Sequence, residues 1–155
     1  MSVGRIDDRL AELGLTLPKA PAAAGAYLPA VTSGSLLYTA GQVPFVDGAF
    51  PAHGKVGAEV DAETAKSLAA VCALNGLAAA AELLGSLDRV TRVVKVVGFV
   101  ASDPSFTGQP GVINGASELL GEIFGEAGQH ARSAVGVAVL PLDAPVEVEL
   151  VLEFV

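Results

Sequence analysis

Residues 90–101 constrain the fold more than any other segment of this 155-residue chain. Side chains alternate between the two faces of a β-strand, and here large apolar residues fall on both faces. They are Val93, Val94, Val96, Val97, Phe99 and Val100. A strand that is apolar on both faces is typical of a sheet interior covered on two sides. We therefore expect a central strand over 90–101, ended by Asp103-Pro104.

Local patterns predict further elements before and after this strand. Residues 27–31 and 36–40 are expected to be short strands joined by a turn. Asp61 is placed to cap a long helix that Gly85 ends. A second helix is expected over 111–124. At the start of the chain, the pattern predicts a short amphipathic helix over 2–13 and an extended connector over 15–25.

Residues 132–155 predict a second hairpin, whose return strand places its glutamates on one face. In this hairpin Arg132 would pair near Glu153, and Glu147 would pair near Ala138. The side chains of Arg132 and Glu147 in one chain would then lie roughly 20 Å apart. If the two residues share one small ligand, they must come from different subunits.

The expected order of elements is strand, strand, helix, strand, helix, strand, strand. This order predicts an α+β layer in which two helices cover one face of a mixed sheet. The other face would stay bare in a single chain. Because 52% of the residues are hydrophobic and only 17% are charged, subunit association is the simplest cover for that face.

Composition also argues against several functional classes. The formal net charge of −8 opposes nucleic-acid binding, which depends on phosphate neutralisation by Lys and Arg. The longest apolar stretch, 68–84, is mostly alanine and contains Glu82, so no membrane span is expected. Cys72 is the single cysteine and no signal peptide is recognised, which favours the cytoplasm. His53 and His130 lack partners at metal-ligand spacing, so no metal is expected.

Three segments carry a family resemblance through their order and spacing across 27–155. They are Tyr38-Thr39-Ala40-Gly41-Gln42-Val43-Pro44, Val94-Lys95-Val96-Val97-Gly98-Phe99-Val100, and Ala131-Arg132-Ser133-Ala134-Val135-Gly136-Val137 continuing to Leu140-Pro141 and Val146-Glu147-Val148-Glu149. Together they resemble the Rid family (also called the YjgF/YER057c/UK114 family), whose best-known branch hydrolyses reactive enamines and imines. Shorter members lack the N-terminal part. We therefore divide the chain into an extension of helix and connector, 1–21, and a single Rid-like α+β domain, 22–155.

The resemblance implies a chorismate-mutase-like mixed sheet with two helices on one face. It also implies a homotrimer whose sheets face the central core, with clefts between neighbouring subunits. Arg132 would bind the substrate carboxylate, and Glu147 would position or activate the attacking water. Tyr27, the Gly41 backbone and Asn114 would line the cleft. No cofactor is expected, because an imine is already electrophilic.

Each candidate residue also has a purely structural alternative. Arg132 could pair with Glu153 across the hairpin, and Glu147 could be a solvated glutamate on a polar strand face. Tyr27 could pack under the hairpin, and Asn114 could be a helix-start residue.

Three positions depart from the active branch of the family. Ala40 stands where that branch has serine, Ala134 where it has cysteine, and Gly136 where it has glutamate. The first hypothesis is a hydrolytic deaminase of small 2-imino or 2-enamino acids. The alternative is a non-catalytic trimer that binds small 2-keto acids or other carboxylate metabolites, which the two alanines favour. Endoribonuclease activity, attached to some relatives, is a third hypothesis that the acidic charge disfavours.

Overall fold

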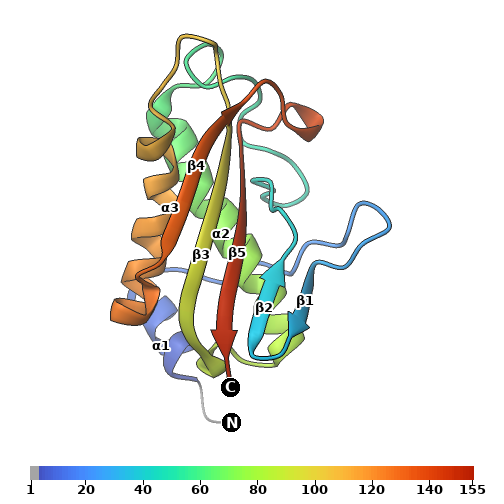
Figure 1. Ribbon diagram of the computed structural model, residues 1–155, viewed down its shortest axis with the longest axis vertical. Helices are drawn as coiled ribbons and strands as arrows, with labels where there is room; N and C mark the ends of the chain where they lie inside the picture. The colour runs from blue at the N-terminus through green and yellow to red at the C-terminus, as the bar shows by residue number, and fades with distance from the viewer. Residues whose placement is uncertain (1–3) are drawn as a thin grey trace.

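The computed structural model describes residues 4–155 and contains a single five-stranded sheet (Figure 1). The sheet order is β1-β2-β5-β3-β4. The strands are β1 Ala30–Ser33, β2 Leu36–Thr39, β3 Val90–Ala101, β4 Ala131–Val137 and β5 Val146–Phe154. β3 pairs antiparallel with β5 and parallel with β4, so the mixed sheet predicted from the sequence is confirmed. The predicted bounds of β3 are also confirmed, and β3 has a hydrogen-bonded strand on each side.

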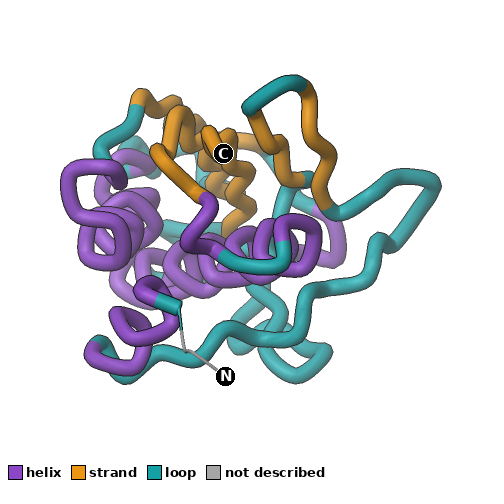
Figure 2. The backbone as a smooth tube through the Cα atoms, turned by 90° about the horizontal axis from the view of Figure 1, so that it is seen from below, coloured by secondary structure: helices purple, strands orange, loops and turns teal. Residues whose placement is uncertain are grey.

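Three helices accompany the sheet: α1 Arg5–Glu12, α2 Ala62–Leu84 and α3 Gln109–Phe124. Three short 3-10 helices complete the regular structure: η1 Leu87–Arg89, η2 Gly125–Gly128 and η3 Pro141–Asp143. Figure 2 shows the strands gathered in one layer and the helices beneath it. The expected α+β layer is therefore present, with α2 and α3 on one face of the sheet and the other face open.

The long helix α2 begins and ends where its sequence predicts. The Asp61 side chain accepts a hydrogen bond from the Thr64 backbone N–H at 2.7 Å, and Gly85 ends the helix in the left-handed region at φ 85°. By length and composition alone α2 could cross a membrane, but 61% of its most apolar window is buried inside the fold. Burial against the sheet therefore accounts for its apolar character.

The predicted hairpin of β4 and β5 is wrong, because β3 lies between these two strands. Arg132 pairs with Val96 rather than with Glu153, and Glu147 pairs with Phe99 rather than with Ala138. The cause is the crossover through α3, which returns the chain so that β4 runs parallel to β3. β4 becomes an edge strand with no buried residue, whereas β5 buries every second side chain.

The N-terminal helix α1 is fixed to the body of the domain at its first turn. The carboxylate of Asp88, in η1, accepts hydrogen bonds from the backbone N–H groups of Arg5 and Ile6, both at 2.8 Å. These bonds lower the pKa of Asp88 and satisfy two donors that a helix N-terminus leaves free. Residues 2 and 3 of the predicted helix lie outside the described residues, and Gly14 follows the helix with φ 71°.

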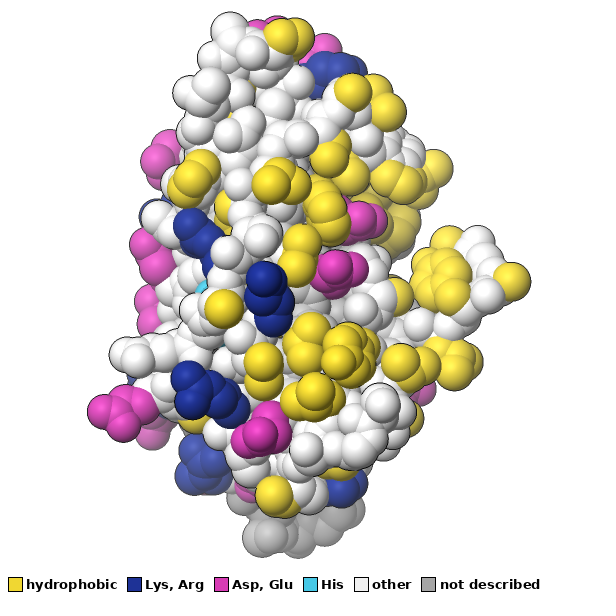
Figure 3. Space-filling view, viewed as in Figure 1, with side chains coloured by type: hydrophobic (Ala, Val, Ile, Leu, Met, Phe, Trp, Pro, Cys, Tyr) yellow, Lys and Arg dark blue, Asp and Glu magenta, His cyan; other side chains and the backbone are white. Residues whose placement is uncertain are grey.

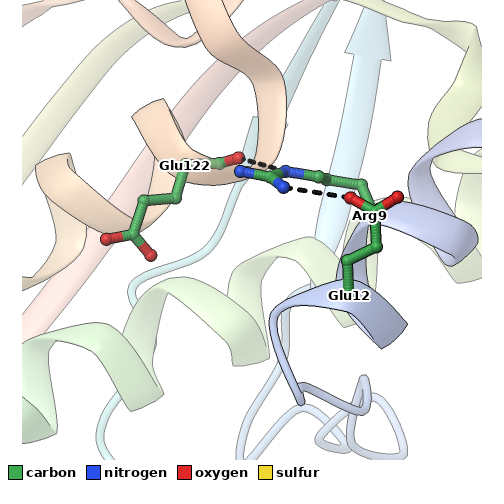
Figure 4. Close-up of polar contacts among 3 residues, drawn as sticks. All are labelled: Arg9, Glu12 and Glu122. Carbon is green, nitrogen blue, oxygen red and sulfur yellow. Dashed lines mark hydrogen bonds and ion pairs between the residues drawn. The ribbon is translucent and has the colours of Figure 1, made fainter.

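A second contact ties α1 to α3. The guanidinium of Arg9 donates from Nε to the Glu122 backbone carbonyl at 2.8 Å (Figure 4). Its Nη1 pairs with Glu12 at 3.0 Å within the same helix. Ile6 and Leu10 are buried beneath these polar contacts, so α1 packs as part of the core.

Candidate functional site

Arg132 lies at the start of the edge strand β4, on the sheet face that the helices cover. Its Nη1 donates to Asn114 Oδ1 at 2.7 Å and to Ser117 Oγ at 3.2 Å. Asn114 and Ser117 are three residues apart in α3, so they share one face of that helix. Glu153, the alternative partner of Arg132, instead accepts a hydrogen bond from Thr91. We call Arg132, Asn114 and Ser117 the arginine cluster.

His130 extends the arginine cluster. Its Nε2 lies 2.8 Å from Ser117 Oγ, and its Nδ1 lies 2.6 Å from the Gly128 carbonyl oxygen. The ring is half-buried, between Ser117 of α3 and Gly128 of η2. The sequence gave no reason to select Ser117, apart from its helical spacing from Asn114.

Glu147 lies on β5 and faces away from the helices, because its neighbours Val146 and Val148 are fully buried in the core. The Glu147 side chain is half-buried. Burial raises the pKa of Glu147, and the charge of Glu149 adds to the rise. This is the environment in which a carboxyl group exchanges protons closer to neutral pH.

Gly41 provides the space that the Glu147 carboxyl group occupies. A Cβ atom at position 41 would lie only 2.8 Å from Cδ of Glu147. Gln42 and Val148 exchange two backbone hydrogen bonds, at 2.8 and 2.9 Å, which hold this segment beside β5. We call Glu147 and Gly41 the glutamate cluster.

Tyr27 joins neither cluster within one chain. It lies in the loop before β1 and is 52% exposed. Its hydroxyl accepts a hydrogen bond from the Ala24 backbone N–H at 3.2 Å. The loop is tied to the end of β2, since the Ala40 backbone N–H donates to the Pro29 carbonyl at 2.8 Å.

The two clusters lie on opposite faces of the sheet. Arg132 pairs with Val96, and Glu147 pairs with Phe99, three residues further along β3. An odd number of residues reverses the face, and no register shift occurs between these pairs. From two strand spacings and three residue rises, the Cα atoms of Arg132 and Glu147 are roughly 14 Å apart. One chain therefore cannot present both side chains to one small molecule.

Gly136 and Ala134 lie on β4, the strand that carries Arg132. A Cβ at Gly136 would lie 2.8 Å from Gln109 Nε2, so Gln109 occupies the space beside that position. Gln109 is held there by hydrogen bonds to Ser102 Oγ at 3.2 Å and to the Phe106 carbonyl at 2.8 Å. Ala134 is half-buried against the core.

Cys72 is a core residue. It is fully buried in α2, and burial, with the charge of Glu147 as a second cause, raises the pKa of its thiol well above the ordinary value. A thiol in this state is a poor nucleophile. Within residues 4–155, no three His, Cys, Asp or Glu side chains are grouped closely enough to hold a metal ion.

The five-stranded mixed sheet with helices on one face defines a chorismate-mutase-like α+β fold. The sequence profile of the family described as "YjgF/chorismate_mutase-like, putative endoribonuclease" matches residues 7–154. The chain belongs to this family, the YjgF/Rid family.

Three proteins similar to this chain carry different names. "Protein TCP17" of Trypanosoma cruzi is 46% identical over 151 residues, which is 97% of this chain and 94% of the relative. The crystal structure of Atu1372 from Agrobacterium tumefaciens, a protein of unknown function, is 46% identical with a TM-score of 0.89, and the match covers 97% of this chain and 93% of that one. The "2-iminobutanoate/2-iminopropanoate deaminase" of Salmonella typhimurium is 35% identical over 134 residues, covering 85% of this chain and 90% of the relative.

Proposed function

We propose that the chain is a hydrolytic deaminase of small, reactive 2-imino and 2-enamino acids. Water adds to the imine carbon and ammonia leaves, so one 2-imino acid and one water give one 2-keto acid and one ammonia. An enamino acid takes up a proton on carbon first and becomes the imine. The name of the Salmonella typhimurium relative supports this reaction class.

The half-buried Glu147 is the observation that carries the proposal. Its pKa is raised by burial, and Gly41 leaves room for its carboxyl group. A carboxylate of this kind can accept a proton from the attacking water and return it to the departing nitrogen. A solvated glutamate is a weaker base, because bulk water stabilises its ionised form.

Arg132 supplies the carboxylate anchor in this proposal. A guanidinium offers parallel N–H groups that match the two oxygens of a carboxylate, and it stays charged at any physiological pH. Asn114 holds the guanidinium from α3 rather than facing open space. In this scheme Asn114 therefore supports Arg132, and the substrate is bound mainly by the arginine.

We further propose that the two clusters meet between chains, in a homotrimer whose sheets face the central core. Support comes from the open sheet face, where Val31, Tyr38 and Val135 are each more than 40% exposed. Figure 3, which looks onto this face, shows apolar side chains gathered over the strands with charged side chains among them. A second chain that approached this face with its β4 edge would cover them and bring the arginine cluster at that edge to the glutamate cluster of the first.

The experiment generates 2-iminopropanoate in situ with an amino-acid oxidase and follows its conversion to the keto acid. We expect the protein to accelerate hydrolysis over buffer. Arg132→Ala and Glu147→Gln should each remove the acceleration. Arg92→Ala and Glu153→Gln are the matched controls, an exposed arginine of β3 and a further glutamate on the same face of β5. An intact wild-type protein that does not exceed the rate in buffer would reject the activity.

A non-catalytic carboxylate-binding protein is the second candidate. Few groups near the proposed site can transfer a proton, which favours this candidate. Positions 40 and 134 carry alanine, and the Gln109 side chain fills the space beside Gly136. Calorimetry with a panel of 2-keto acids separates the two. Binding that Arg132→Ala abolishes, without imine hydrolysis, would establish the second function in place of the first.

A further inference from the structure

The hydrogen bonds around His130 have directions that the chemistry of the groups determines. The Gly128 carbonyl can only accept, so Nδ1 of His130, 2.6 Å away, carries a proton. In the neutral ring Nε2 is then an acceptor, and the Ser117 hydroxyl, 2.8 Å away, donates to it. The Ser117 oxygen keeps its lone pairs for Nη1 of Arg132. The contacts therefore form one continuous chain, from Arg132 through Ser117 and His130 to Gly128.

This series of hydrogen bonds ends on a rigid part of the fold. Gly128 is buried and packs directly against the backbone of Leu120 and Gly121 in α3. Ser117 lies on the same helix, one turn before Leu120. The imidazole of His130 is therefore fixed at both nitrogens by groups that α3 holds in place.

The same contacts use one end of the Arg132 guanidinium and leave the other end free. A guanidinium has five N–H donors, of which Nη1 carries two. Asn114 and Ser117 accept from Nη1. Within the described residues, Nε and Nη2 of Arg132 make no hydrogen bond to the protein. The Nε and Nη2 edge is one of the two edges that bind a carboxylate through a pair of parallel bonds.

We propose that Ser117 and His130 are positioning residues for Arg132. Ser117 binds Nη1, and His130 holds Ser117 in place. The Nε and Nη2 edge is thereby oriented for the carboxylate of the ligand before the ligand binds. This role rests on the proposed function only in that Arg132 is the carboxylate anchor. Neither Ser117 nor His130 touches the ligand, and each acts through the guanidinium.

The first test needs no ligand. Nitrogen relaxation of the Arg132 Nε–H group, measured by NMR in the unliganded protein, reports the mobility of the guanidinium. Ser117→Ala and His130→Ala should both increase that mobility, while Ser117→Thr, which keeps a hydroxyl group, should retain the wild-type value. The matched control is Ser67→Ala, since the Ser67 hydroxyl in α2 bonds only to the Thr64 carbonyl of its own helix. Unchanged Arg132 mobility in both Ser117→Ala and His130→Ala would overturn the proposal.

The second test measures the consequence for binding. With 2-oxobutanoate as the probe in calorimetry, Ser117→Ala and His130→Ala should each weaken binding about three- to tenfold, the worth of one hydrogen bond. The double variant should lose no more than about the larger single loss, because both residues act in series on one guanidinium. In imine hydrolysis the change should appear in KM, with kcat kept within about twofold.

The outcomes separate this proposal from the proposed function. If Arg132→Ala abolishes binding but Ser117→Ala and His130→Ala bind like the wild type, positioning is wrong and the anchor stands. If the wild type and Arg132→Ala bind equally weakly, the anchor is wrong. The mobility of Arg132 then still decides whether Ser117 and His130 hold its side chain.

Discussion

One added methyl group at Gly41 tests whether the Glu147 carboxyl group must lie where the structure places it. The alanine Cβ would lie 2.8 Å from Cδ of Glu147, whereas ordinary contact begins at 3.4 Å. The carboxyl group must therefore retreat by about 0.6 Å, the difference between these distances. Gly41 has no positive φ, so alanine does not strain the backbone there.

The displacement should affect catalysis more than stability. Misplacing a catalytic group by about 1 Å can lower a rate by about 100-fold, so we expect kcat to fall between about 10- and 100-fold. The displaced atoms end a flexible side chain, so the free energy of unfolding should change by less than about 1 kcal/mol.

The assay compares Gly41→Ala with Gly121→Ala in imine hydrolysis and in denaturant unfolding. A Cβ at Gly121, in α3, meets no atom within 4 Å. That control should keep the wild-type kcat and gain about 0.5–1 kcal/mol, because alanine is the better helix residue. A folded Gly41→Ala protein with the wild-type kcat would refute the role assigned to the Glu147 carboxyl group.

Three further predictions concern stability and its pH dependence. Glu147→Gln should raise the free energy of unfolding at about pH 8, because the raised pKa of Glu147 makes its ionised form costly in the folded state. This gain should vanish below about pH 4, where the wild-type carboxyl group is protonated in both the folded and the unfolded state. Asp88→Ala should cost about 1 kcal/mol in denaturant unfolding at neutral pH and speed amide exchange at Arg5. Since the pKa of Asp88 is lowered, this cost should shrink as the pH falls below the range of an ordinary aspartate and through the lowered pKa of the folded state. Gly115→Ala should cost about 1–3 kcal/mol or more and lower Tm, because its Cβ would strike a backbone carbonyl of α2.

The elements that the sequence predicted well are those with local signals. The cap at Asp61 and the glycine at 85 define α2, and the doubly apolar pattern defines β3. The predicted pairing of β4 with β5 was wrong, because an alternating pattern of apolar and polar residues shows that a segment is a strand but not which strand it pairs with. In the structure the segment between Val137 and Val146 contains a 3-10 helix and left-handed residues, so it does not form the tight turn that a hairpin needs.

The structure shows which candidate residues lie together, and their roles in a site stay predictions. Arg132 and Asn114 do meet, and Glu147 does lie against Gly41. The expectation that one chain cannot bring Arg132 and Glu147 to one ligand holds for a different reason, since they lie on opposite sheet faces rather than far apart along a hairpin. Ser117 could not be selected, because a single helix serine carries no pattern beyond its spacing.

Mixing two inactive variants tests the shared site most directly. Arg132→Ala keeps the glutamate cluster, and Glu147→Gln keeps the arginine cluster. When equal amounts are unfolded and refolded together, the proposed trimer, assembled at random, should recover about one quarter of the wild-type activity. One interface in four then pairs an intact Arg132 with an intact Glu147 of the neighbouring chain. Mixed oligomers that form but stay inactive would contradict an interface built from the two clusters.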